Sequence, residues 1–387
     1  MTLFYNDMNI DLFDASFVRS GRRRICEGWS HEAFVSRKLS SLSLSDAVIL
    51  SSRGWIDGKL SGGIIDSDGN YLSSSGYVNG GGKPYIYTNP RRTDETFIYL
   101  GCFNICWGHA ITDNLSRLWF LRTEECRKLL DEGARVVYVP GMNVSLPEWH
   151  KEVFRLAGVN PDLLYPITEP VLCKRVVVPD RSLFVVDGYL RYTEEFRNII
   201  NIIINNVDSD GRRTDKIFFT RSAVKDSREW GNEKEIDKLF KSQGYEVISP
   251  ENFSVMEQIR LLKGCREFAA PEGSCSHNAI FCSPGTKVTV LRKACYVNKY
   301  TIAIGYITGV KTVYVDANAT IIVHPRCPMV GPFYTCVTSC LCRCLGVSTS
   351  YSPYYMNKSY WEYFCWLVRF VIFAIWRKTI GRLLFKK

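Results

Sequence analysis

The chain of 387 residues is too long for a single small hydrophobic core, so its length predicts two domains with additional segments. A hydrophobic content of 46% and a charged content of 23% are those of a globular protein and exclude an intrinsically disordered one. The formal net charge is +10, but residues 321–387 hold nine Lys or Arg residues and one acid, so +8 belongs to this tail. The remainder is close to neutral, which argues against a nucleic acid as partner.

The N-terminal segment and the cysteines favour a reducing, cytoplasmic environment. Residues 1–20 contain three aspartates and no continuous apolar stretch, so they do not resemble a signal peptide. The fifteen cysteines are too sparse for a disulfide scaffold, and no two have the C-x-x-C spacing of a zinc ribbon. The sequon at 114–116 lies in a predicted helix that carries candidate catalytic residues, where a glycan would be disruptive. We therefore expect free thiols.

Residues 1–100 are predicted to form a β-rich N-terminal region. The first 45 or so show little pattern, whereas short apolar segments alternate with glycine-rich turns over residues 47–100. The pair Asp68-Gly69 is a strong signal for a β-hairpin. No obvious chemistry falls in this region.

From residue 101 the pattern changes to alternating strands and helices. Residues 101–207 and 208–320 each contain such a series, with a polar linker at 208–215. Two consecutive series predict an α/β protein with two Rossmann-like domains facing a cleft, where ligands bind at the carboxyl ends of the strands. The predicted elements are helix 111–121, strand 135–139, helix 148–157, strand 174–178, helix 193–205, strand 216–220, helix 233–243, strand 245–248, helix 254–263 and strand 312–315.

Residues 267–291, EFAAPEGSCSHNAIFCSPGTKVTVL, read as a strand, a tight turn, a short helix and a second strand. Ser274 or Ser276 can cap the helix, which is expected to begin near Cys275. A glycine turn that leads into a helix offers backbone N–H groups and the positive end of a helix dipole, which suits a diphosphate. The alternative is a turn of this kind without a ligand, which many α/β proteins have.

His109, Asp113 and Arg117 follow one another at four-residue steps, so on a helix they share one face. The functional interpretation is a His that acts as acid or base beside the cleft, oriented by an acid. His109 is the preferred base because neutral imidazole dominates near pH 7, and Asp113 is the alternative base. The structural interpretation is an Asp113–Arg117 ion pair on a surface helix, with His109 as an incidental cap.

Arg221 comes directly after a predicted strand, where a guanidinium can bind a phosphate with two N–H groups. Arg228 and Asn232 follow at seven and eleven residues. Asn232 also suits a structural role, because it can cap the next helix together with Glu235.

The blocks that contain these residues resemble the successive blocks of glycosyltransferase family 61, the capsular-polysaccharide-type transferases with a His-x-x-x-Asp helix and a Gly-Ala-Gly-Leu-Thr-Asn-like loop. Order and spacing are kept over roughly residues 49–291. The resemblance implies an inverting, nucleotide-sugar-dependent enzyme with two Rossmann-like domains, a GT-B-like arrangement. The blocks are GHAITDNLSRL, IFFTRS followed by GNEKEI, YEVISPENFSVMEQIRLLKGC and APEGSCSHNAIFCSPGTKV.

The resemblance also implies roles for individual residues. It places His109 and Asp113 near the reacting centre. The sequence departs from the family pattern at Glu272, where relatives commonly have His, and at Cys275, where they have a second glycine. These departures support the alternative of a transferase-like module that has lost catalysis and serves as a membrane-bound assembly subunit. The residues implied around the donor are Arg221, Arg228, Asn232, Glu272, Gly273, Ser274, Ser276 and Asn278.

No metal and no tightly bound cofactor is expected. The D-x-D strings at 66–68 and 208–210 are each followed by Gly in a polar segment, which is typical of turns rather than of a metal-bound diphosphate. Basic groups and a helix terminus are available for the diphosphate of the donor instead. The four cysteines within 336–344 fit no common zinc pattern; we expect free thiols, with lipidation as the alternative.

Residues 321–387 are predicted to form a basic, Cys- and Trp-rich tail that associates with a membrane. The apolar segment 363–376 would be about 21 Å long as a helix, shorter than the roughly 30 Å hydrocarbon core of a bilayer. Its tryptophans and the basic residues that follow favour an interfacial anchor on an anionic membrane surface. A deeper, re-entrant position and a helix packed on the body of the protein are the alternatives.

Together these features predict a glycosyltransferase that is cytoplasmic and peripheral to the inner face of a membrane. It would move a hexosyl, pentosyl or N-acetylhexosaminyl group from a nucleotide sugar to a glycan acceptor, lipid-linked and destined for a surface polysaccharide such as a capsule. A soluble enzyme that modifies nucleotide sugars is less favoured, because no G-x-G-x-x-G follows an early strand.

Overall fold

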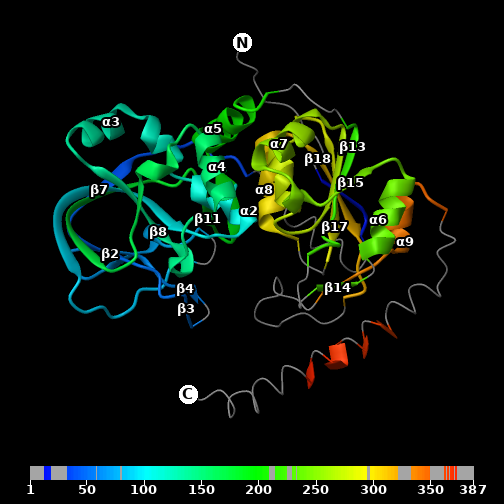
Figure 1. Ribbon diagram of the computed structural model, residues 1–387, viewed down its shortest axis with the longest axis horizontal. Helices are drawn as coiled ribbons and strands as arrows, with labels where there is room; N and C mark the ends of the chain where they lie inside the picture. Colours follow the sequence, from blue (N-terminus) through cyan, green and yellow to red (C-terminus); the bar gives the residue numbers. More distant parts are fainter. Residues whose placement is uncertain are drawn as a thin grey trace.

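The computed structural model describes residues 13–18, 33–57, 59–78, 81–208, 214–224, 229–231, 233–293, 297–320, 333–348 and parts of 361–372. Over these residues the chain has a mixed α/β fold with parallel strand pairs, as the sequence predicts. Figure 1 shows two sheets side by side, with helices between them.

The first sheet has seven strands, of which β7 (Arg91–Phe103) and β10 (Val171–Pro179) are a central parallel pair. Strands beyond β7 are parallel and strands beyond β10 are antiparallel. The boundary predicted between residues 100 and 101 falls inside β7, so strands from both sides of it build one sheet. Their order is β6 (Tyr71–Leu72), β5 (Gly63–Ile65), β2 (Ser41–Leu50), β10, β7, β8 (Arg135–Pro140) and β9 (Leu164–Pro166).

The predicted hairpin at Asp68-Gly69 is confirmed, since it joins β5 to β6. Gly69 has a φ of +85°, which a residue with a side chain rarely adopts. The Asp66 carboxylate accepts hydrogen bonds from the N–H groups of Asp68 and Asn70, at 3.1 and 2.8 Å. The first D-x-D string therefore shapes a turn.

The second sheet has six strands, and every neighbouring pair in it is parallel. Its edge strand β1 comes from the N-terminal region and pairs with β18. The sequence analysis missed β1, because the alternation of apolar and polar residues in FDASF covers only five residues of a segment that otherwise shows little pattern. The order is β1 (Phe13–Phe17), β18 (Lys311–Asp316), β17 (Lys287–Arg292), β16 (Glu267–Pro271), β13 (Lys216–Phe219) and β15 (Glu246–Ile248). The small ribbons pair β3 (Trp55–Ile56) with β4 (Lys59–Leu60), β11 (Leu183–Val186) with β12 (Tyr189–Tyr192), and β14 (Glu229–Gly231) with β19 (Phe333–Thr335).

Most predicted helices are present, within one or two residues. The helix α7 begins at a capping box, in which the Ser254 hydroxyl accepts from the Glu257 N–H and the Glu257 carboxylate accepts from the Ser254 N–H. The helix α8 was missed because it is buried on nearly all sides and has no polar face to give it a period. The longer helices are α3 (Glu124–Asp131), α4 (Glu148–Leu156), α5 (Glu194–Asn205), α6 (Glu233–Ser242), α7 (Val255–Gly264), α8 (Lys299–Thr308) and α9 (Ser339–Cys344).

The helix predicted over residues 111–121 is wrong. The helix α2 (Trp107–Ala110) ends before it, and the short 3-10 turns η2 (Asp113–Leu115) and η3 (Leu118–Arg122) follow. Thr112 departs from helical geometry, with φ −128° and ψ −87°, and its hydroxyl donates to the Gly108 carbonyl at 2.6 Å. This side-chain hydrogen bond competes with the backbone bond that would continue the helix.

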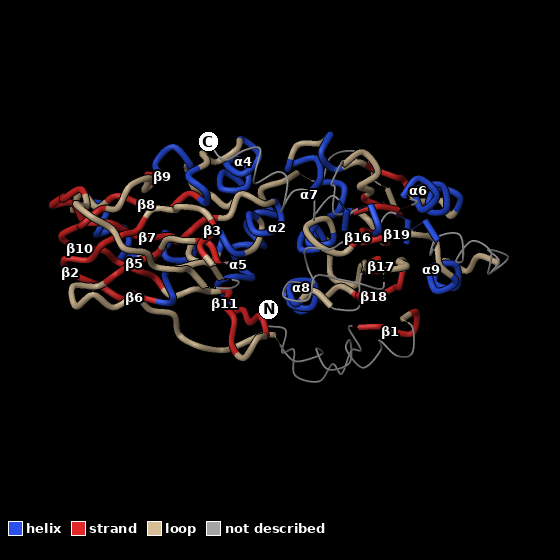
Figure 2. Tube along the Cα trace, turned by 90° about the horizontal axis from the view of Figure 1, so that it is seen from below, coloured by secondary structure: helices blue, strands red, loops and turns tan. Residues whose placement is uncertain are grey.

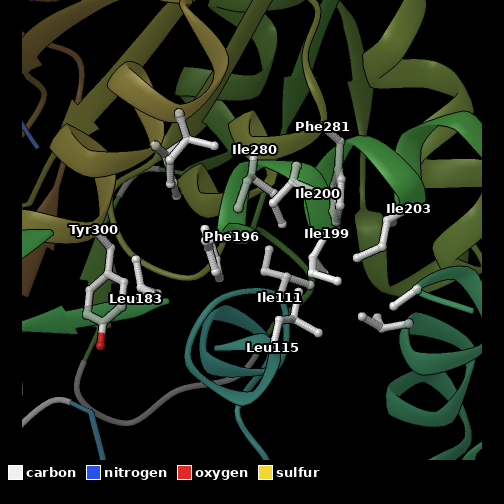
Figure 3. Close-up of a cluster of buried hydrophobic side chains, with 14 of the residues drawn as sticks. Ile111, Leu115, Leu183, Phe196, Ile199, Ile200, Ile203, Ile280, Phe281 and Tyr300 are labelled. Atoms are coloured by element: carbon white, nitrogen blue, oxygen red, sulfur yellow. The ribbon is translucent and has the colours of Figure 1, made fainter. Parts of the chain in front are cut away.

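One hydrophobic cluster joins the two sheets. Its centre is α5, whose apolar residues recur at steps of three and four and so form one stripe. Side chains from the turns after α2, from η7 (Ser276–Phe281) and from α8 pack around this stripe, which we call the inter-sheet core. Figure 3 shows its members Ile111, Leu115, Leu183, Phe196, Ile199, Ile200, Ile203, Ile280, Phe281 and Tyr300.

The C-terminal region divides into a packed part and an exposed part. Cys340, Leu341 and Cys342 of α9 are buried in a hydrophobic cluster with residues of β13 and β18, so this part belongs to the second sheet and not to a tail. The four cysteines predicted to be free thiols are free.

The described residues of 361–372 are helical, and Trp361 and Phe364 are exposed. Most of the rest of the predicted tail lies outside the described residues. Among the helices that the structure describes, none has both the length and the apolar character needed to cross a bilayer. Figure 1 shows the described helical turns of 361–372 apart from the two sheets.

We predict that Phe281→Ala lowers the free energy of unfolding by about 3–5 kcal/mol, because it opens a cavity in the inter-sheet core. Calorimetry should show a single unfolding transition at a lower temperature than in the wild type. Both sheets share this core, so they are expected to unfold together. The control is Leu163→Ala at an exposed apolar residue, which should change stability by less than about 0.5 kcal/mol. Two transitions, of which only one moves, would contradict a shared core.

Candidate active site

The His109–Asp113 pair is formed, although the helix predicted to carry it is not. The imidazole Nδ1 lies 2.7 Å from Asp113 Oδ2. The same carboxylate oxygen accepts a hydrogen bond of 2.9 Å from the hydroxyl of Tyr300, on α8. Asp113 is buried, whereas the His109 side chain is 28% exposed. The arrangement leaves the imidazole as the accessible member of the pair.

The environment of His109 raises its pKa. Burial by itself lowers the pKa of this imidazole, but the negative charge of Asp113 and the hydrogen bond to it outweigh burial. The fraction of His109 that is neutral at pH 7 is therefore smaller than in an imidazole with the ordinary pKa of 6.5. With Nδ1–H directed to Asp113, Nε2 is the nitrogen that can exchange a proton, and the carboxylate stabilises the imidazolium that results.

Arg117 does not share the face of His109 and Asp113, so the predicted ion pair is wrong. The chain turns at Thr112 and directs Arg117 into the first sheet, where it is buried. Its Nε donates to Pro179 O at 2.6 Å and its Nη2 to Ser74 O at 2.7 Å. Arg117 ties the end of β10 to the 3-10 turn at Ser73–Ser75.

The turn after β16 is closed by a side chain that was predicted to cap a helix. The Ser276 hydroxyl accepts from Gly273 N at 3.2 Å and donates to Gly273 O at 2.9 Å. Gly273 has a φ of +115°, so a side chain here would strain the turn. The element that follows, η7, is a 3-10 helix with Cys275 as N-cap and no side-chain cap. Its dipole is correspondingly shorter than that of the predicted α-helix.

This turn packs directly on α2. A Cβ atom at Gly108 would lie 2.5 Å from His277 Nδ1 and 2.9 Å from Ser274 Oγ, so only glycine allows the approach. The indole N–H of Trp107 donates to Asn278 Oδ1 at 3.2 Å, and the Asn278 amide donates to Cys275 O at 3.0 Å. The structure thus brings the His-x-x-x-Asp segment and the glycine turn together, from opposite sheets.

Tyr300 and His277 complete this contact, and the sequence analysis missed both. The Tyr300 ring lies edge-on to His109, with 5.7 Å between ring centroids, and 5.3 Å from His277. Burial lowers the pKa of His277 to about 3, so this imidazole stays neutral beside His109. His277 lies within the block APEGSCSHNAIFCSPGTKV, but the sequence analysis assigned roles only to its neighbours there. Tyr300 lies on α8, whose sequence shows no helical period of apolar residues.

Glu272 contacts the start of α8, the helix that carries Tyr300. It is buried, and its Oε1 accepts a hydrogen bond of 2.9 Å from the N–H of Asn298, the residue that caps α8. Burial raises its pKa to about 7, although the positive charge of Arg292 partly opposes that shift. A buried path therefore runs from Glu272 through the start of α8 to Tyr300 and Asp113. Glu272 thus braces α8.

Arg221 lies at the same edge of the second sheet as the glycine turn. It lines a small pocket at the carboxyl ends of β13, β16 and β17, together with Thr220, Pro271 and Leu291. The Cys275 thiol donates to Phe219 O at 3.6 Å, which joins the turn to the end of β13. Cys275 is buried and fills this contact.

Arg228 and Asn232, the two remaining donor candidates, lie outside the described residues.

Residues 107–289 match the model of the family described as Glycosyltransferase 61. The predicted resemblance to glycosyltransferase family 61 is confirmed over these residues. The match runs from α2 to β17 and contains the His109–Asp113 pair, Arg221 and the glycine turn. Members of family 61 transfer sugars, so a sugar donor and a glycan acceptor are the substrates of this family. No curated protein matches the chain.

We predict that Glu272→Gln stabilises the protein at pH 8 and changes it little at pH 5. The pKa of Glu272 is raised from 4.5 to about 7 in the folded state. The contribution of the protonated carboxyl group to the free energy of unfolding is therefore complete below pH 4.5, and it is lost as the pH rises through 7 and the buried group becomes charged. The substitution removes the buried charge and keeps the oxygen that accepts from Asn298. The midpoint of thermal unfolding should rise by an amount equivalent to roughly 3 kcal/mol at pH 8. An equal effect at both pH values would contradict a titrating Glu272.

Proposed function

We propose that this chain is an inverting glycosyltransferase with a GT-B-like arrangement, in which the two sheets represent two Rossmann-like domains. The observation that carries the proposal is the His109–Asp113 pair, packed against the glycine turn through Tyr300 and the contact between Trp107 and Asn278. A base and a candidate diphosphate-binding turn thus meet within the segment that matches the family.

The proposed reaction transfers the sugar in one displacement. The acceptor hydroxyl attacks the anomeric carbon opposite the nucleoside diphosphate, and the bond to the diphosphate oxygen breaks as the new bond forms. His109 Nε2 takes the proton of the hydroxyl, and the Asp113 carboxylate stabilises the imidazolium. Asp113 Oδ2 is held by both His109 and Tyr300, which supports His109 rather than Asp113 as the base.

The donor would bind at the carboxyl edge of the second sheet. Arg221 supplies a charge for the diphosphate, and Gly273 and Ser274 supply backbone at the turn, without a metal being required. The side chains of Ser276, Asn278 and Glu272 are hydrogen-bonded to the protein, so we assign them to the support of the turn. Arg228 and Asn232 remain donor candidates through the family resemblance.

The acceptor would be a lipid-linked glycan of a surface polysaccharide, reached from the cytoplasmic face of a membrane. The exposed apolar residues Trp361, Phe364 and Ile372, and the basic residues that follow them in the sequence, support an interfacial anchor. The hydroxyl of Tyr334, on β19, donates to Glu362 Oε2 at 2.5 Å, which ties the start of this segment to the β14–β19 ribbon.

We predict that His109→Ala and Arg221→Ala separate transfer from donor binding. His109→Ala should lower the rate of transfer by about 10² to 10⁴, the usual loss for a general base, with unchanged affinity for the nucleotide diphosphate. Arg221→Ala should weaken that affinity at least tenfold, about 1.4 kcal/mol. Calorimetric titration of nucleotide diphosphates and a transfer assay with lipid-linked acceptors measure the two effects.

The matched control is Arg266→Ala, which removes an exposed arginine before β16, at the opposite edge of the same sheet. It should leave both measurements unchanged. Full transfer by His109→Ala would remove His109 from the reaction. Wild-type protein that binds a nucleotide diphosphate but transfers nothing would favour the inactive assembly subunit.

We predict that removal of residues 360–387 releases the protein from vesicles that contain anionic lipid. The basic and aromatic residues of the anchor are then lost, whereas the candidate donor site is formed by other segments. Cosedimentation should fall to the level seen with neutral vesicles, while nucleotide affinity stays the same. A shortened protein that still sediments with anionic vesicles would contradict the anchor.

A further inference from the structure

Two tryptophans form a pair beside the candidate base. Trp107 and Trp149 are both partly exposed, and their rings lie 5.4 Å apart at an angle of 58°. Trp107 comes two residues before His109 on α2, and Trp149 lies in the first turn of α4. Figure 2 shows α2 and α4 side by side, with α7 and α8 between them and the second sheet. We call Trp107 and Trp149 the tryptophan platform.

The side chain of Trp149 is supported by the ring of the next residue, His150. Its ring stacks on the buried His150 ring, with 5.2 Å between centroids and an angle of 6°. Burial lowers the pKa of His150 to about 4, so this imidazole is neutral at pH 7. Its Nε2 accepts from the amide of Asn114 at 3.1 Å, and the same amide donates to Asn104 O at 2.8 Å. A glycan on Asn114 would disrupt these two hydrogen bonds, as the sequence analysis expected.

Trp107 is held from the other sheet. Its indole N–H donates to Asn278 Oδ1, directly after the glycine turn to which we assign the donor. The ring is thereby fixed in orientation, with its polar atom satisfied by the protein. A fixed aromatic face loses little conformational entropy when a ligand binds to it.

The segment after β8 carries further exposed apolar side chains. Met142 and Asn143 have φ values of +55° and +54°; asparagine adopts this left-handed region readily, whereas methionine is strained in it. Met142 and Val144 are exposed. Phe103 contacts both this segment and the residue beneath Trp149. Its carbonyl packs closely on Gly141, where an added Cβ would lie 2.6 Å from the Phe103 oxygen, and its ring stacks on the His150 ring. Strain of this kind is concentrated at ligand-binding and catalytic sites.

We propose that the tryptophan platform binds the acceptor glycan by stacking against a neutral pyranose ring. One face of a pyranose consists of C–H groups, which an aromatic ring desolvates while the hydroxyls at the rim stay available. The platform is built of aromatic and amide groups, so it suits a neutral sugar rather than a phosphate. The inference rests on the proposed function, and it assigns the acceptor to α2 and α4 and the donor to the edge of the second sheet.

Titration of the full-length protein with neutral oligosaccharides tests the platform without any transfer. The panel carries glucose, galactose or N-acetylglucosamine at the non-reducing end, and ligand-observed NMR measures affinity. Trp149→Leu keeps apolar bulk but removes the ring, and it should weaken binding at least tenfold. Trp149→Phe keeps a ring and should bind within about threefold of wild type. Trp55→Leu, at an exposed tryptophan on β3, is the matched control and should change nothing.

Nucleotide diphosphate binding is measured on the same samples and should be equal in all four proteins. Wild type that binds no member of the panel, or equal binding by wild type and Trp149→Leu, would overturn the platform and leave the proposed donor site intact. Loss of binding in Trp55→Leu as large as in Trp149→Leu would overturn it as well. Saccharide binding through Trp149, without binding of any nucleotide diphosphate, would support the platform and count against the proposed transfer.

Discussion

The carboxylate of Asp113 is the contact on which the candidate site depends. One of its oxygens accepts from His109 on the side of the first sheet and from Tyr300 on the side of the second. A buried charge is stable only with such partners, so the fold must bring both elements to it. The two hydrogen bonds therefore fix the imidazole, the start of α8 and the spacing of the two sheets together. A displacement of one sheet against the other would break the hydrogen bond to Tyr300 and leave His109 as the remaining partner of this pair.

The inter-sheet core makes that spacing stiff. The apolar stripe of α5 packs both on the turns after α2 and on η7. The same side chains therefore contact elements from both sheets. Gly108 permits the closest approach, because a side chain there would collide with His277. A close-packed interior does not deform gradually. We expect substrates to enter a site that is already assembled, with adjustments confined to side chains and loops.

The sequence predicted the elements that have a clear period and the pairs that are local. The capping box at Ser254, the hairpin at Asp68-Gly69 and the contact between His109 and Asp113 all lie within four residues. Tyr300 could not be found in this way, since its partner Asp113 is 187 residues away and its helix has no polar face. The role of Ser276 was misjudged because a serine at such a position can cap a helix or close a turn, and only the backbone of Gly273 decides between them.

The pairing of β1 with β18 has a consequence for the order of folding. β1 leaves the ribosome before the other strands of the second sheet, and its partner Lys311–Asp316 follows almost 300 residues later. At a synthesis rate of 5–20 residues per second, β1 waits about 15–60 s for a strand to pair with. The other strands of the second sheet can assemble in chain order during this time. Insertion of β1 then covers the exposed edge of β18, which would otherwise be open to strands of other molecules. The N-terminal strand can thus join its sheet only after β18 has been made, and its pairing removes an open strand edge from the nascent protein.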